Sequence, residues 1–191
     1  MPMRYKSTGY LAGQMLIAMP TMRDPRFVRT VIYICAHTAE GAMGLVVNRR
    51  LEALTFPDLL DQLGIEPTTY CDPIRIHFGG PVEAGRGFVL HSTDYIQDTT
   101  MMVDENVALT ATVDVLKAIA EGRGPRHSML ALGYAGWSPG QLDSEIRENV
   151  WLVGNADDNL LYGENIERKW EQAIANLGID CTMLSGEAGH A

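Results

Sequence analysis

The chain has 191 residues, of which 46% are hydrophobic and 20% are charged, and its formal net charge is −9. This composition suits one soluble domain with a substantial core and excludes a disordered chain. The longest apolar runs, Met15 to Met19 and Thr30 to Cys35, are too short to cross a bilayer. With no convincing secretory signal, we expect a cytoplasmic location and no membrane association.

The negative charge is concentrated in the second half of the chain. Residues 104–191 hold fourteen acidic and six basic side chains, whereas residues 1–103 hold ten and nine. Clustered Lys and Arg bind nucleic acids, so this distribution disfavours direct DNA binding. The one basic concentration consists of Arg23, Arg26, Arg29, Arg49 and Arg50.

The three cysteines, Cys35, Cys71 and Cys181, are widely separated and form no C-x-x-C pair. This spacing favours idle or buried thiols over a disulfide framework or a zinc site. Cys35 ends an apolar stretch and is expected to be a small core residue. The sequence therefore indicates neither a bound metal nor a cofactor.

The start of the chain is predicted to form strands. Residues 13–19 predict a first strand, which Pro20 ends. β-Branched and aromatic residues at 30–36 predict a second strand that is buried on both faces. Residues 43–48 predict a third strand, which forms a hairpin with the second across a turn containing Gly41.

Four helices are expected farther along the chain. The first covers residues 57–63, with Thr55 or Phe56 as its N-cap. The second begins at Thr112, the third follows Ser138, and the fourth is capped by Asn165 and ends before Gly178. The remaining strands are expected at 74–78, 87–91, 100–103, 128–134 and 150–155.

These elements predict the fold class. The consecutive strands at the start argue for antiparallel pairing, and strands and helices do not alternate regularly. We therefore expect an α+β fold, with a mixed α/β fold as the alternative, in which about four helices surround a mixed sheet. A single domain is predicted over residues 1–182, followed by a disordered tail at 183–191.

The stretch GYAGWSPGQLDSEI predicts a sharp strand-to-helix corner. Ser138 is expected to cap the helix, with Pro139 as the first helical residue and Gln141 completing a capping box. Trp137 and Leu142 have the spacing of a hydrophobic staple. A ligand-contacting loop is the alternative, since a helix N-terminus after a glycine-bearing turn can bind an anion. The stretch lacks G-x-S-x-G and is therefore not a nucleophile elbow.

The segment Gly79-Gly80-Pro81 separates two predicted strands. Turn chemistry favours a hairpin connection, and a glycine-lined groove for a small ligand or peptide is the alternative. His77 and His91 lie near the ends of these strands and could face one another. They make a weak metal site without Asp, Glu or Cys at ligand spacing. A triad of His91 with the neighbouring Ser92 and Asp94 is discounted, because triad members meet in space rather than in sequence.

The basic residues around Arg26 and Arg49 permit two interpretations. Together with Asn48, they could form a small anion-binding surface at the end of the hairpin. A solvated rim on an acidic protein is favoured over that surface. Acidic residues early in the helix after the corner, such as Glu145, suit the helix dipole without any catalytic role.

Five motifs follow one another in the chain: D-P-R-F at 24–27, G-L-V-V-N-R at 44–49, G-G-P-V at 79–82, V-L-H at 89–91 and G-Y-A-G-W-S-P-G-Q-L-D-S-E-I at 133–146. Together they resemble the AlgH/YqgE family of bacterial cytosolic proteins, over nearly the whole chain. The departures are mild. Ser138 and Asp143 stand where the family pattern usually has Gly and Glu, and Arg50 replaces a common Pro.

The resemblance implies a bent or bifurcated, mostly antiparallel mixed sheet, part of which curls into a small barrel with helices around it. The family carries the label of transcriptional regulator but has no agreed activity and no agreed catalytic or ligand residues. Because the chain is acidic, a regulatory effect is expected to run through protein or small-molecule contacts rather than through DNA.

The leading hypothesis is a non-enzymatic regulatory or binding module, with no catalytic or metal-binding residues assigned. Its expected contact surface consists of Arg23, Asp24, Arg26, Phe27, Asn48, Gly79, Gly80, Pro81, His91, Trp137, Gly140, Gln141 and Glu145. The alternative is a hydrolase or phosphate-handling enzyme that acts on a small anionic substrate through His91 or Glu145. If the glycine turn, the basic loop and the Trp137 corner lie on separate faces, the shared surface is wrong.

Overall fold

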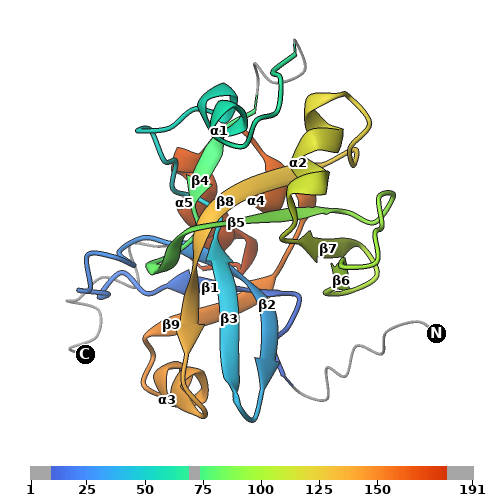
Figure 1. The fold of residues 1–191 in the computed structure, drawn as a ribbon. Helices are drawn as coiled ribbons and strands as arrows, with labels where there is room; N and C mark the ends of the chain where they lie inside the picture. Colours follow the sequence, from blue (N-terminus) through green and yellow to red (C-terminus); the bar gives the residue numbers. More distant parts are fainter. Residues whose placement is uncertain (1–9, 69–73, 180–191) are drawn as a thin grey trace.

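The computed structural model describes residues 10–68 and 74–179, and in this part of the chain nine strands form one sheet (Figure 1). The strand order is β6-β7-β5-β8-β3-β2-β1-β9, and β4 pairs only with β8. The strands are β1 (Gln14–Ala18), β2 (Val31–Thr38), β3 (Gly41–Val46), β4 (Ile76–Phe78), β5 (Val82–Ser92), β6 (Met101–Met102), β7 (Val107–Thr110), β8 (Ser128–Trp137) and β9 (Trp151–Asn155).

Five α-helices lie around this sheet in the described ranges. They are α1 (Phe56–Gln62), α2 (Val113–Ala120), α3 (Gln141–Arg147), α4 (Asp158–Tyr162) and α5 (Lys169–Asn176), with the 3-10 helix η2 (Ile166–Arg168) before α5. Figure 1 shows α1 and α2 at one end of the molecule and α3 at the other, near the tip of the β2–β3 hairpin. No helix in the described ranges is long and apolar enough to cross a membrane.

The sheet forks at β8. Every pairing is antiparallel except that of β4 with β8. Along one edge of β8, residues 130–132 pair with β4, whereas residues 135–137 pair with β3. The other edge pairs with β5. The expected α+β class and bifurcated, mostly antiparallel mixed sheet are therefore confirmed.

The segment Gly79-Gly80-Pro81 crosses over β8 from one edge to the other. It connects β4 to β5, and these two strands flank β8 instead of pairing with each other. Two strand spacings amount to about 10 Å, which three extended residues can span. The expected hairpin connection is therefore wrong. Turn chemistry marked the break between the strands, but a third strand inserts between them.

Glycine is required where the two backbones cross. A Cβ added at Gly79 would overlap the carbonyl oxygen of Gly133, and one added at Gly80 would overlap the backbone of Tyr134. Gly133 has a φ of +79° and itself faces the carbonyl of Gly80. Hydrogen bonds hold the crossing in place: the Gly79 amide donates to Leu132 (2.8 Å), and its carbonyl accepts from Val46 (2.9 Å).

The curled sheet buries side chains on both of its faces. Along β2, Tyr33 and Cys35 enter the main core beside α4 and α5, while Ile32 and Ile34 pack on the opposite face toward α3. A third cluster lies beneath α1 and α2. The prediction that Cys35 is a core residue is confirmed, and its burial raises the pKa of the thiol to about 12. Cys71, Cys181 and the predicted tail lie outside the described residues.

Two elements were not predicted. All four residues of the strand β7 are buried, so polar and apolar residues do not alternate along it. The strand also directly follows a polar turn. The helix α4 has only five residues, too few for a helical period to be recognised.

The predicted last helix divides into η2 and α5, and Asn165 makes no side-chain cap bond. The strands β5 and β8 are also longer than expected, because Val82 of β5 pairs with Tyr134 of β8 and residues 135–137 of β8 pair with β3.

The crossing predicts a sharp difference between two glycines that lie close in sequence. Gly80→Ala should lower the free energy of unfolding by about 3 kcal/mol or more, because the methyl group meets backbone that cannot move aside. Gly85→Ala is the matched control, since a Cβ there meets nothing within 4 Å. It should change stability by less than about 0.5 kcal/mol. Urea denaturation measures both, and equal effects would contradict the crossing.

Candidate functional site

Three segments that are distant in sequence meet at one cleft of about 510 Å³. They are the loop after β1, the end of the crossing with the start of β5, and the corner from β8 into α3 together with the start of β9. Seven of the residues expected on the contact surface line the cleft: Asp24, Arg26, Phe27, Pro81, Trp137, Gln141 and Glu145. The basic loop, the Trp137 corner and, from the glycine turn, Pro81 therefore line one cleft, and the role of this cleft as a contact surface stays a prediction.

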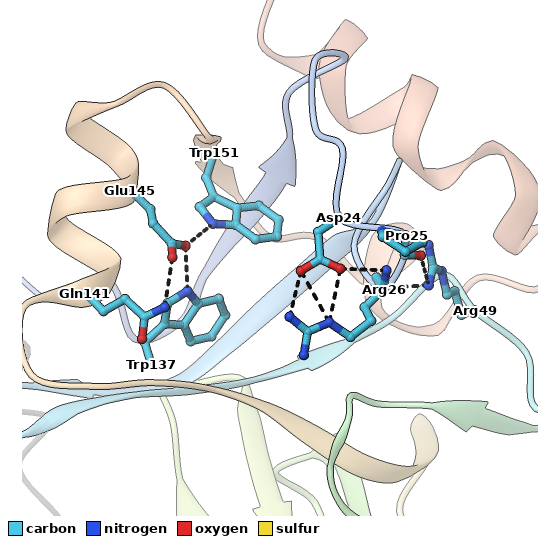
Figure 2. A network of polar contacts seen from close by, with 8 residues as sticks. All are labelled: Asp24, Pro25, Arg26, Arg49, Trp137, Gln141, Glu145 and Trp151. Carbon is cyan, nitrogen blue, oxygen red and sulfur yellow. Dashed lines mark hydrogen bonds and ion pairs between the residues drawn. The ribbon is translucent and has the colours of Figure 1, made fainter.

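A carboxylate held by two tryptophans forms one wall of this cleft (Figure 2). The indole Nε1 groups of Trp137 and Trp151 donate to the same oxygen of Glu145, at 3.0 and 2.9 Å. The side-chain amide of Gln141 donates to the other oxygen at 2.9 Å. Gln141 and Glu145 are one helical turn apart on α3, so they present to the same side. None of the three donors carries a charge.

The corner that begins α3 differs from the predicted capping box. Gly140, with a φ of 76°, precedes the first helical residue, and the amide of Gln141 donates to the carbonyl of Ser138 at 2.9 Å. These features describe a type II turn with Pro139 and Gly140 at its centre. The expectations that Ser138 caps the helix and that Pro139 is its first residue are therefore wrong. Only half of the box exists, in which the Ser138 amide donates to the side chain of Gln141.

The facing wall carries an ion pair. The guanidinium of Arg26 binds both carboxylate oxygens of Asp24, with the shortest contact at 2.7 Å, and the Arg26 amide donates to Asp24 at 3.0 Å. These hydrogen bonds hold the pKa of Asp24 below its usual value and raise that of Arg26. Arg26 also lies 5.4 Å from the ring of Phe27, which packs edge-on against Trp151.

The neighbouring polar side chains hold the loop in place. Arg49 donates to the carbonyls of Arg26 and Val28 at 2.7 and 2.8 Å, and to that of Pro25 at 3.3 Å. Asn48 accepts from the amide of Val31 and donates to the carbonyl of Arg29, each at 2.9 Å. Because the side-chain donors of Arg49 and Asn48 already bond to backbone carbonyls of the protein, they do not form the expected anion-binding surface.

The remaining expected residues lie elsewhere. Arg23 is exposed on the loop, outside the cleft. Asn48 belongs to the loop clamp, Gly140 to the turn, and Gly79 and Gly80 to the crossing. Among the cleft residues that were not predicted, Trp151 has the largest role. Its position in a strand gave no sign that its indole reaches Glu145.

His91 does not belong to any surface. It is fully buried, and its Nε2 and Nδ1 lie 2.7 Å from the Thr110 hydroxyl and 2.8 Å from the Ser92 carbonyl. Its expected place on the contact surface is therefore wrong, because the register of β5 turns it inward. His77 lies across β8 on β4, so the two histidines do not share a strand pair. The described residues include no group of three His, Cys, Asp or Glu side chains arranged for a metal.

A second hollow adjoins the cleft. It has a volume of about 670 Å³, and its lining is mostly apolar. Val82, Gly136 and Trp137 line both spaces. Trp137 is the one residue of the predicted surface that lines this hollow.

Comparisons identify relatives over nearly the whole chain. The family described as AlgH-like matches residues 15–182. A UPF0301 protein of Rhodospirillum rubrum is 58% identical over 186 residues, which cover 97% of each chain. Another from Bradyrhizobium diazoefficiens is 53% identical over 193 residues, covering 97% of this chain and 90% of that one.

Two solved structures have the same fold. The AlgH protein from Pseudomonas aeruginosa is 43% identical, with a TM-score of 0.79 over 99% of this chain and 100% of that one. A protein from Corynebacterium diphtheriae is 20% identical, with a TM-score of 0.75 over 92% and 91% of the two chains. The second likeness concerns the fold alone.

The carboxylate between the indoles predicts a local stability effect. Glu145→Ala should lower the free energy of unfolding by about 2–4 kcal/mol, because two buried indole donors lose their acceptor. It should also alter the tryptophan emission. Glu148→Ala is the control, since this exposed residue lies on the same helical stretch, and its effect should stay below about 0.5 kcal/mol. Denaturation and emission curves of Glu145→Ala that are identical to those of the wild-type protein would argue against the hydrogen bonds from the two indoles to Glu145.

The buried His77 predicts a pH dependence. Burial lowers the pKa of His77 to about 4, below its unfolded value near 6.5. Between these values the unfolded chain binds a proton that the folded chain does not. The free energy of unfolding should therefore be about 3 kcal/mol lower near pH 4 than above pH 6.5, and the loss occurs as the pH falls between these two values. NMR should show no titration of the His77 ring from pH 8 to 5.5, and a midpoint near 6.5 would contradict the burial.

Proposed function

The chain belongs to the AlgH-like family, and from the geometry of its cleft we propose that it is a non-enzymatic regulatory module that binds a protein partner. The supporting observation is the wall in which Glu145 is fixed between two indoles, opposite the Asp24–Arg26 pair. Such a wall is rigid and part polar, part aromatic, which is typical of the centre of a recognition surface.

The charges of the cleft favour a basic side chain from the partner. The carboxylates of Asp24, Glu145 and Glu148 line the cleft, and Arg26 is the one basic residue among its lining. Because Arg26 is already paired with Asp24, it offers little attraction to an anion. The aromatic rings beside these carboxylates would in turn attract an ammonium or guanidinium group. A net charge of −9 would speed the approach of a basic partner.

A regulatory effect would then be indirect. The protein would change the activity or availability of its partner, and any effect on transcription would follow from that contact rather than from DNA binding. This proposal accounts for the acidic composition, since a phosphate backbone would be repelled by most of the molecule. The cytoplasm is the compartment that we propose for this interaction.

The enzymatic alternative finds less support at the cleft. Of the two residues considered for catalysis, Glu145 is engaged by three donors and His91 is buried in the sheet. A small anionic substrate would also meet an acidic lining. A binding role therefore fits this surface better than turnover of an anion.

Charge reversal at the cleft rim tests the proposal. Partners captured from a lysate by the wild-type protein would be identified by mass spectrometry and purified, and their direct affinity would be measured by calorimetry. Glu148→Arg should weaken that affinity at least tenfold, because an exposed acidic group at the cleft becomes basic. Asp61→Arg, the same change on the distant α1, should leave it unaltered. Equal affinities for both variants would reject the cleft as the contact surface.

A further inference from the structure

A large pocket of about 940 Å³ lies between the turn from β6 to β7, the segments that follow β5 and precede β8, and the start of α4. Its size is at the upper end of the range of small-molecule sites. Carboxylates from three separate segments line it: Asp94, Asp104, Asp157 and Asp158. We call this space the aspartate pocket. The described residues that line it differ from those that line the cleft.

The carboxylates of this pocket also serve the loops that carry them. Asp94 accepts a hydrogen bond from the amide of Arg126 at 2.9 Å. The Oδ1 atom of Asp104 accepts from the amides of Asn106 and Val107, each at 2.8 Å. These bonds account for acidic residues in tight turns, so the acidic lining by itself does not indicate a ligand.

Two tyrosine hydroxyls provide an independent observation. Tyr162 lines the pocket, and its ring stacks on that of His127 with the centroids 5.5 Å apart. Tyr33 on β2 is 0% exposed. Both hydroxyl oxygens are buried, and neither has a hydrogen-bond partner in the described part of the chain. A buried hydroxyl without a partner costs free energy, which a group bound beside it would recover.

Both hydroxyls lie near Asp104. Burial raises the pKa of Tyr162, and the carboxylates of Asp158, Asp104 and Asp94 raise it further. Burial also raises the pKa of Tyr33, and Asp104 is the largest of the charges that add to this shift. Because the effect of a charge falls with distance, the two hydroxyls converge on the carboxylate wall of the pocket. The Oδ2 atom of Asp104 accepts no hydrogen bond within residues 10–68 and 74–179.

A primary ammonium group satisfies these atoms together. It carries a positive charge and three N–H donors, so it can donate to Oδ2 of Asp104 and to a tyrosine oxygen at the same time. An anion would be repelled by the three carboxylates that act on Tyr162. A neutral hydroxyl group would satisfy the tyrosine but would leave the carboxylate without a counter-charge.

We propose that the aspartate pocket binds a small organic cation that has a primary ammonium group. The ammonium would lie between Asp104 and the hydroxyl of Tyr162, and its carbon chain would lie against Val107 and Leu161, which line the same space. The exposed Arg126 would stay beside Asp94, away from the ammonium. This site is independent of the protein-binding cleft, and it requires no chemical step.

An NMR titration of the purified full chain at low salt tests this proposal with four matched probes: butylammonium, butyltrimethylammonium, 1-butanol and butanoate. Butylammonium should bind at least tenfold more tightly than the other three, because it alone combines the positive charge with N–H donors. Equal affinity for butyltrimethylammonium would overturn the hydrogen bonds, and equal affinity for butanol or butanoate would overturn the charge. Absence of butylammonium binding would reject the pocket.

Two variants with the same charge change locate the site. Asp104→Asn keeps an oxygen that can accept from the turn amides but removes the charge, and it should weaken butylammonium binding at least tenfold. Asp61→Asn on α1 is the control and should leave the affinity unaltered. Amide shifts on adding butylammonium should cluster at Asn106 and Tyr162. Equal affinities for the two variants, or shifts confined to α3, would reject the pocket without affecting the proposal for the cleft.

The tyrosine hydroxyl is tested by Tyr162→Phe, which removes one oxygen and keeps the ring. Butylammonium affinity should fall at least fivefold, whereas the urea midpoint without butylammonium should be unchanged or higher, because a buried hydroxyl without a partner is lost. Unchanged affinity would overturn the role of the hydroxyl. A lower urea midpoint would show that the hydroxyl already has a partner in the folded protein, which would contradict the premise of the proposal.

Discussion

Close backbone contact between Gly79, Gly80 and Gly133 allows the chain to cross over β8, and this crossing determines the arrangement of the whole sheet. It puts β4 and β5 on opposite edges of β8, which leaves the C-terminal half of β8 free to pair with β3. The fork follows from that arrangement. Because no side chain fits between the two backbones, the crossing depends on glycine rather than on any particular polar contact.

The same crossing places residues at the cleft. Its last residue, Pro81, and the first residue of β5, Val82, both line that space. The cleft gains further rigidity from hydrogen bonds that fix both of its walls, through Glu145 on one side and Arg49 behind the other.

The cleft shares the acidic character of the whole protein, and we propose that it suits a basic partner. Its carboxylates come from the loop after β1 and from the C-terminal part of α3 and the residue that follows it. The composition of the chain indicates the sign of this charge, but net charge does not record which side chains meet.

Local patterns in the sequence determined most of the elements, the fold class and the family resemblance, because hydrophobic periods and turn residues act over a few positions. They also predicted that the loop at Asp24, the turn at Pro81 and the corner at Trp137 share a face. Only the tertiary structure decided what those residues contact. The insertion of β8 between β4 and β5, the burial of His91 and the bond from Trp151 to Glu145 all depend on pairing between distant segments, which no local pattern encodes. Even the cap of α3 was decided by the competing Pro-Gly turn, whose geometry moved the start of the helix past Ser138.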